Sequence, residues 1–174
     1  MNFSLKNSIQ ILECTPTVLN SMLQDIEPDW TSNNEGKDTW SVYDVIGHLI
    51  HGEKTDWVPR AKIILSENSN KNFEVFDRFA QFEESKEKSL TELLDEFSNL
   101  RKENLDWLRT ANITEEDLEK KGIHPAFGEV TLSQLLATWT VHDLNHLAQI
   151  ARVMSKQYLA AVGPWTAYLK ILQS

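Results

Sequence analysis

Apolar residues spaced at helical steps constrain the fold of this chain more than any other feature of its sequence. They recur every three or four residues along most of the 174 residues, and the short alternating runs that mark strands are scarce. The six glycines and five prolines stand mostly where helices should end. The sequence therefore predicts an all-α protein with a single domain over residues 1–174.

Four long helices and one long connection are predicted. The helices cover roughly 5–26, 40–65, 90–110 and 131–158, with a short last helix at about 163–172. Pro16 predicts a kink or break in the first helix, and Pro59 predicts a bend in the second. Ser41, followed three residues later by Asp44, is typical of a capping box at the start of the second helix. We expect an up-and-down-type four-helix bundle with a long crossover and a short C-terminal helix.

The crossover, residues 66–89, is polar but carries four aromatic rings. They are Phe73, Phe76, Phe79 and Phe82, at three-residue steps. Four such rings will not all sit in water. We therefore expect the segment to pack back over the bundle, and a lid over a site is the alternative interpretation.

Composition and charge narrow the classes of function. Hydrophobic residues make up 41% and charged residues 25%, as in globular proteins, and the formal net charge is −9. Nucleic acids and anionic membranes both need basic surface, so neither is expected as a partner. The one cysteine, Cys14, excludes an intrachain disulfide and a cysteine-rich metal site. Because the chain shows no signal-like start and no run of about 20 apolar residues, we expect a cytoplasmic protein.

Two histidines interrupt the apolar seam of the fourth predicted helix. The seam steps by three and four through Leu132, Leu135, Trp139, His142, His146, Gln149 and Val153. Such a seam faces the core of a bundle, where polar groups need partners. His142 and His146 lie one turn apart on one face, which suits the capture of one metal ion. A hydrogen-bonded polar core is the alternative.

The second predicted helix offers a third ligand. Its inward face holds Val42, Val45, Leu49, Glu53 and Asp56. At about 100° per residue, His48 lies at the edge of this face and His51 points roughly 60° further out. Catalytic zinc usually has three protein ligands and one open position. We therefore predict His48, His142 and His146 as metal ligands and His51 as a surface residue.

Two polar residues near these histidines are candidate helpers in catalysis. Glu53 could accept a hydrogen bond from the second nitrogen of a ligand histidine, as metal sites usually provide. It could equally pair with Arg60, two turns further on the same side. Gln149, one turn beyond His146, could orient a water, or it could be a tolerated polar core residue, which we favour.

Other residues and motifs are expected to carry no chemistry. Asp143 points about 100° away from His142 and is expected at the surface or as a cap. His124, beside Pro125, is expected in a turn. The sequence holds no glycine-rich phosphate loop, no Gly-x-Ser-x-Gly elbow, no His-Glu-x-x-His motif and no Glu-x-x-His pair of a di-iron bundle.

The order of these motifs resembles that of the DinB-like superfamily. Residues 40–49, WSVYDVIGHL, with Glu53 beyond them, are similar to its second-helix motif. Residues 142–150, HDLNHLAQI, are similar to its fourth-helix motif, as are His124-Pro125 and residues 128–132, GEVTL, before them. The helix around Arg101 and the Gly163-Pro164-Trp165 tail fit one branch of the family. The resemblance covers nearly the whole chain.

The resemblance implies a four-helix bundle that holds one divalent metal, often nickel or zinc, through three histidines that map onto His48, His142 and His146. Manganese and iron are further candidates. Similar proteins include S-transferases that use bacillithiol or mycothiol and a maleylpyruvate isomerase, and many others carry only the description of metal-dependent hydrolase. Homodimers are frequent in the family, so a homodimer is expected here.

Three neutral imidazoles would leave a dication with open positions, where it can activate water or a thiol. We therefore expect an enzyme acting on a small molecule, either a hydrolase or a transferase that uses a low-molecular-weight thiol as cosubstrate. Glu53 and Gln149 would assist. A non-catalytic metal-binding or ligand-binding module is the alternative, and a metal-free helical interaction protein is a third hypothesis.

Overall fold

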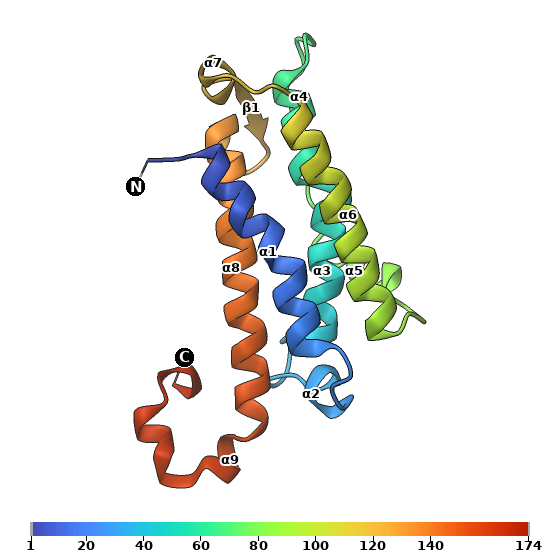
Figure 1. Ribbon diagram of the computed structural model, residues 1–174, viewed down its shortest axis with the longest axis vertical. Helices are drawn as coiled ribbons and strands as arrows, with labels where there is room; N and C mark the ends of the chain where they lie inside the picture. Colours follow the sequence, from blue (N-terminus) through green and yellow to red (C-terminus); the bar gives the residue numbers. More distant parts are fainter. Residues whose placement is uncertain (1, 174) are drawn as a thin grey trace.

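The computed structural model describes residues 2–173 and is mostly helical, with four long rods packed as a bundle (Figure 1). The rods are α1 (Leu5–Leu23), α3 (Val42–Thr55) continued by α4 (Trp57–Leu65), α6 (Leu90–Thr110) and α8 (Leu132–Gln157). The shorter elements are α2 (Asp29–Ser32), α5 (Ala80–Glu84), α7 (Glu115–Leu118), α9 (Leu159–Val162), strands β1 (Lys121–His124) and β2 (Gly128–Thr131), and 3-10 segments Gly163–Tyr168 and Lys170–Leu172. The predicted four-helix bundle is confirmed.

The long crossover sets the directions of the rods. In Figure 1, α1 and α8 run one way along the bundle, and α3–α4 and α6 run the other way. This follows from residues 66–89, which return the chain from the far end of α4 to the start of α6. Both α1 and α3 pack against α6 and α8. All four rods therefore surround one common centre.

Capping boxes fix where the rods begin. The box predicted at Ser41 is present: the Ser41 Oγ accepts from the Asp44 amide at 3.2 Å, and the Asp44 carboxylate accepts from the Ser41 amide at 2.9 Å. Ser89 opens α6 in the same way, and Thr131 opens α8. These boxes place the starts of three rods within one or two residues of the positions that the sequence predicts.

The two prolines have different outcomes. At Pro16 the prediction was a kink or a break, and α1 runs through this residue without a break. Proline has no amide hydrogen, which leaves the Leu12 carbonyl without its helical donor, and Arg101 fills the vacancy with an Nη1 hydrogen bond of 2.8 Å. Near Pro59 the chain does break, because α3 ends at Thr55 and α4 begins at Trp57.

The core has two hydrophobic clusters with a polar layer between them. One cluster, at the end that carries the hairpin, includes Leu12, Trp57, Leu105 and Trp139. The other includes Leu19, Leu49, Phe97 and Ile150. Along α3, α6 and α8, the residues between these clusters include Glu53, Arg101 and Asp143, all at most 2% exposed. The centre of the bundle is therefore charged.

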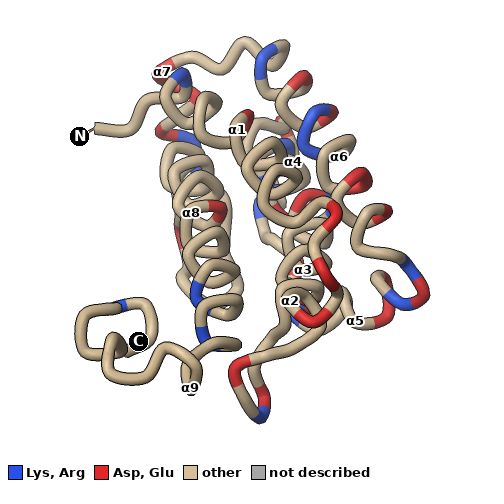
Figure 2. The backbone as a smooth tube through the Cα atoms, turned by 60° about the horizontal axis from the view of Figure 1, so that its bottom comes forward, with Lys and Arg blue, Asp and Glu red and all other residues tan. Residues whose placement is uncertain are grey.

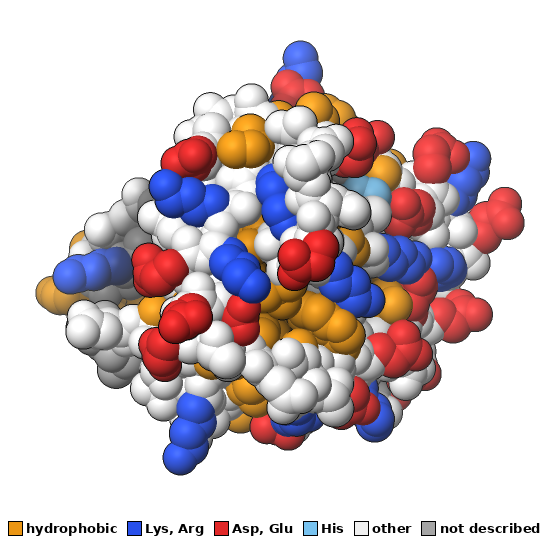
Figure 3. All heavy atoms as spheres, turned by 90° about the horizontal axis from the view of Figure 1, so that it is seen from above, with side chains coloured by type: hydrophobic (Ala, Val, Ile, Leu, Met, Phe, Trp, Pro, Cys, Tyr) orange, Lys and Arg blue, Asp and Glu red, His pale blue; other side chains and the backbone are white. Residues whose placement is uncertain are grey.

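The connections depart from the sequence prediction in three places. The loop expected at 28–38 contains α2. The turns expected around Gly122 and Gly128 form an antiparallel β1–β2 hairpin. The last segment consists of α9 and two 3-10 turns. The end of the molecule that is viewed from above in Figure 3 shows hydrophobic side chains among charged ones of both signs.

The crossover is attached to the bundle near both of its ends. Phe73 is 5% exposed and pairs with the hairpin through its amide and the Ile123 carbonyl, 2.9 Å apart. Gly122 makes room for its ring, because a Cβ there would lie 2.4 Å from ring atoms of Phe73. At the other end the Tyr43 hydroxyl donates to the Ser85 carbonyl. The expected packing against the bundle is thus confirmed at the ends of the segment.

The four phenylalanines divide between core and solvent. Phe73 is buried and Phe76 is half-buried, whereas Phe79 is 62% exposed and Phe82 is 43% exposed.

None of the helices within residues 2–173 has the length and apolar character needed to cross a membrane.

Candidate metal centre

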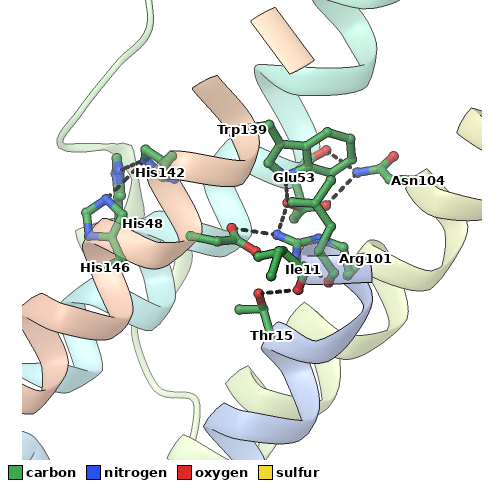
Figure 4. Close-up of polar contacts among 11 residues, drawn as sticks. Ile11, Thr15, His48, Glu53, Arg101, Asn104, Trp139, His142 and His146 are labelled. Carbon is green, nitrogen blue, oxygen red and sulfur yellow. Dashed lines mark hydrogen bonds and ion pairs between the residues drawn. The ribbon is translucent and has the colours of Figure 1, made fainter. Parts of the chain in front are cut away.

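Three histidine rings converge at the interface between α3 and α8. The Nε2 atom of His142 lies 3.1 Å from Nε2 of His48 and 3.0 Å from Nε2 of His146. One ring nitrogen from each residue lies within 4.8 Å of the others. Figure 4 shows the three rings meeting at their tips, with two coming from α8 and one from α3. The three histidines that the sequence selects are thus brought together.

Gln149 decides which nitrogen of His146 is protonated. The His146 Nδ1 lies 2.8 Å from the Gln149 Oε1, and an amide oxygen can only accept. Nδ1 of a neutral His146 therefore carries the hydrogen, and its Nε2 presents a lone pair toward His142. Gln149 fixes the tautomer and the ring orientation that a metal ligand needs.

The convergence is unfavourable without a cation. Nε2 of His142 is within 3.1 Å of two other ring nitrogens, yet it has either one hydrogen or one lone pair. One hydrogen or one lone pair cannot make two well-aligned hydrogen bonds, so at least one of the two contacts is left unsatisfied without a further group. Two histidine nitrogens that share one zinc ion lie roughly 3.3 Å apart, close to the 3.0 and 3.1 Å between His142 and each of its neighbours. The residues present therefore fit a divalent metal.

Burial keeps the rings neutral, as metal ligands must be. Desolvation, assisted by the nearby His146, lowers the pKa of His48 to about 3 and the pKa of His142 to about 2. Burial also lowers the pKa of His146, against the opposing effects of Gln149 and Asp143. A proton therefore competes poorly for these nitrogens near neutral pH.

A cavity of about 940 Å³ opens from the histidines to the surface. Its lining includes the three histidines, polar side chains from α8 and the aromatic rings of Trp40, Phe76, Phe79 and Phe127. Trp40 lies 4.9 Å from His48 and Phe76 lies 5.5 Å from it, measured between ring centroids. The centre is thus accessible to a small molecule through a partly aromatic cleft.

Glu53 belongs to a second polar cluster, centred on Arg101. Its Oε1 accepts from Arg101 Nη2 at 2.8 Å and from Trp139 Nε1 at 3.0 Å, and its Oε2 accepts from Asn104 at 2.9 Å. Figure 4 shows this cluster on the side of α8 away from the histidines. Neither interpretation of Glu53 holds, because its side chain bonds to Arg101, Asn104 and Trp139 rather than to a histidine or Arg60.

Asp143 is the fifth member of the cluster, and its predicted surface position is wrong. Its side chain is 0% exposed, and its two oxygens accept from Arg101 at 2.6 and 2.9 Å. Sequence reasoning missed Arg101 as the partner of Asp143, although its position on α6 is a signal of burial. Arg101 occupies the apolar seam of that helix, between Phe97 and Leu105.

The sequence of this chain also matches a known protein family. The family model of the DinB superfamily matches residues 11–150, which is most of the chain and includes all three histidines. The chain belongs to the DinB superfamily. A search among curated proteins finds no match.

Two solved structures have folds similar to that of this chain. YfiT from Bacillus subtilis, described as a probable metal-dependent hydrolase with an unusual four-helix bundle topology, is 21% identical and has a TM-score of 0.74. The match covers 88% of this chain and 86% of YfiT. TT2238, described as a four-helix bundle protein, is 19% identical with a TM-score of 0.58, over 85% of this chain and 98% of that one.

Two other sequence interpretations change in the structure. His51, expected at the surface, is 5% exposed, and its Nδ1 lies 3.0 Å from the Glu84 carboxylate of α5. Arg60 pairs with Asp56 at 2.7 Å rather than with Glu53. His124 ends β1 and its Nδ1 accepts from the amides of the following turn, as a turn residue would.

Proposed function

We propose that this DinB-superfamily protein is a metal-dependent enzyme whose divalent ion is held by His48, His142 and His146. The observation that carries the proposal is the convergence of three Nε2 atoms, two of them 3.0–3.1 Å from the third, at the inner end of an open cavity. Such a cluster is unfavourable without a cation and well matched to one. Membership of the DinB superfamily supports the proposal, as does the description of YfiT as a probable metal-dependent hydrolase.

The donor set favours catalysis over a purely structural site. Structural zinc sites are closed by four protein ligands, whereas catalytic sites keep a position for water or substrate. Among residues 2–173, the group that could hold a metal consists of three histidines. The fourth direction would therefore be available to a ligand from the cavity.

A divalent ion bound here would lower the pKa of a coordinated water or thiol and so supply a nucleophile near neutral pH. The protein residues would prepare for this in separate ways. Gln149 keeps the hydrogen of His146 on Nδ1, away from the ion. Trp40 and Phe76 exclude water from one side of His48.

Hydrolysis is the reaction that we favour, because YfiT is described as a probable metal-dependent hydrolase and no protein nucleophile is needed. Transfer of a low-molecular-weight thiol uses the same open position and is the second outcome of the test. Zinc is the metal of choice for the assay, since three imidazoles suit it, and nickel, manganese and iron follow.

The test loads the untagged protein with zinc and supplies activated esters, first in buffer alone and then with a small thiol such as cysteine. Release of the leaving group without thiol indicates hydrolysis, and release that consumes thiol indicates transfer. His146→Ala should abolish either activity, whereas Leu144→Ala, at an exposed position on α8, should retain it. Equal activity of the two variants would contradict the proposal.

A further inference from the structure

One part of the crossover passes over the cavity and brings a cation to it. We call residues 74–79 the strap. It leaves the hairpin after Phe73, and the Arg60 side chain donates to its Glu74 carbonyl at 3.2 Å. It ends where α5 begins, and α5 is held on α3 by close contact, since a Cβ on Gly47 would lie 2.4 Å from the Ser85 Oγ. Three of the strap's side chains line the cavity: Phe76, Arg78 and Phe79.

The charged groups that line the cavity differ in how they are paired. They are Glu35, Asp38, Arg78 and Arg152. Arg152 donates two hydrogen bonds of 2.7 and 3.0 Å to the Glu35 carboxylate, so these two charges cancel. Asp38 is exposed at the cavity rim. Within residues 2–173, Arg78 is the cavity-lining cation for which no carboxylate lies within 4.0 Å.

The net charge of the residues that line the cavity therefore differs from that of the whole chain. The chain has a net charge of −9, but the four charged residues lining the cavity sum to zero. Figure 2 shows Lys and Arg toward the C-terminal end of α8, which is the end that carries Arg152. A divalent ion on the histidines would make the cavity positive. With that ion bound, the cleft would attract an anion that the net negative charge of the chain otherwise repels.

Arg78 is placed to act on what binds beside the histidines. Its side chain lines the same cavity as His48, His142 and His146, so a ligand bound beside the histidines lies in the cavity that Arg78 faces. Phe79, its neighbour in the strap, is 62% exposed, and Phe127, which also lines the cavity, is 79% exposed. Exposed rings that line a cleft offer apolar contact to a ligand rather than to the core.

We propose that the substrate of this cavity carries an oxyanion, such as a carboxylate or a phosphate group, next to an apolar or aromatic body, and that Arg78 binds the oxyanion. Guanidinium groups recognise such anions through charge-assisted, often bidentate hydrogen bonds. The exposed rings would hold the apolar body, with the reacting bond directed toward the histidines. This inference deepens the proposed function, since it names a substrate class for the same cavity.

The test uses three small probes that share a phenyl ring: phenylphosphonate, benzoate and the neutral benzyl alcohol. Each is titrated into ¹⁵N-labelled protein, and amide shifts of the cavity residues give both location and affinity. The titrations compare wild type with Arg78→Gln, Arg78→Lys and the matched control Lys86→Gln. Lys86 carries the same charge in the same crossover, is exposed, and pairs only loosely with Glu83 at 3.8 Å.

The proposal predicts that wild type binds the two anions more tightly than benzyl alcohol. Arg78→Gln should weaken both anions about tenfold and leave benzyl alcohol within about twofold. Arg78→Lys should recover part of the loss, and Lys86→Gln should match wild type. Equal weakening of all three probes would show that Arg78 only supports the strap and would overturn the proposal. So would an unchanged affinity for the anions, or a loss of the same size in Lys86→Gln.

The titrations are run on zinc-loaded protein and repeated after treatment with a chelator. The proposed function requires that zinc binds, and the oxyanion site requires the Arg78 effect in at least one of the two forms. If the protein takes up no zinc but Arg78→Gln still weakens anion binding, the metal proposal alone is contradicted. Stoichiometric zinc without any Arg78 effect would sink the oxyanion site alone.

Discussion

Two adjacent residues of α8 enter two polar clusters with opposite properties. Asp143 joins the Arg101 cluster, in which the four hydrogens of the two terminal guanidinium nitrogens all have acceptors. His142 joins the histidine cluster, in which its Nδ1 and that of His48 are buried without a partner. The first cluster lies in the bundle centre and the second opens on a cavity.

The difference separates a structural role from a functional one. The charges of the Arg101 cluster pair with one another and leave only the Arg101 Nε without a partner, so the cluster stabilises one packing of the four rods without a ligand. A cluster whose acceptors face each other needs a ligand from outside. The sequence presents both as polar residues on apolar helix faces, and only their partners distinguish them. The predictions below test this division.

The largest effect should follow from breaking the structural cluster. Arg101→Met would leave Glu53 and Asp143 buried without their cation, and we expect a loss of about 3–5 kcal/mol in the free energy of unfolding, measured with urea. Lys102→Met is the control, because its side chain is 75% exposed and it should cost less than about 0.5 kcal/mol. Similar midpoints for the two variants would contradict the structural role.

The next effect concerns acid stability of the metal-free protein. The folded state holds the pKa of His48 at about 3 and that of His142 at about 2, whereas the unfolded chain binds protons near pH 6.5. The unfolded state therefore binds more protons below that pH, so stability falls as the pH falls from about 6.5 to 4.5. Each histidine contributes up to about 1.4 kcal/mol per pH unit.

The control for this pH dependence is His142→Ala, which removes one of the two groups. Its slope of stability against pH should be flatter than that of wild type by about 1 kcal/mol per pH unit, as measured by urea unfolding across the series. Parallel slopes would show that the histidines are protonated normally in the fold. The burial argument for neutral ligands would then be wrong.

The smallest effect should come from the residue that orients one ligand. Gln149→Leu removes the acceptor for the His146 Nδ1 hydrogen, and zinc affinity should drop about 10- to 100-fold in competition with a chromophoric chelator. Gln149→Glu keeps an acceptor at that position and should retain the affinity. If Gln149→Leu binds zinc as wild type does, the glutamine is only a tolerated core residue.

Much of the fold could be predicted because its signals are local. Periodicity and the capping box at Ser41 place the rods within a few residues of their observed bounds. The hairpin was missed because its strands have four residues each, too few for a clear alternation. Its pairing with the crossover also depends on Gly122, whose missing side chain leaves space for Phe73.

The site was only partly predictable, for a different reason. The spacing of His142 and His146 along one helix identifies two ligands, and the inward edge of the second helix suggests His48. Asp143 and His51 were assigned to the surface because each lies away from the predicted apolar face. Both are buried by partners from distant segments, Arg101 and Glu84, which no local pattern places.

The most direct test of the central claim is the zinc content of the untagged protein after loading and dialysis. Wild type and His124→Ala, a histidine outside the cluster, should each retain about one zinc per chain, and His142→Ala should retain almost none. That result would establish the three histidines as a metal site. Full zinc occupancy in His142→Ala, or no zinc in wild type, would contradict the account.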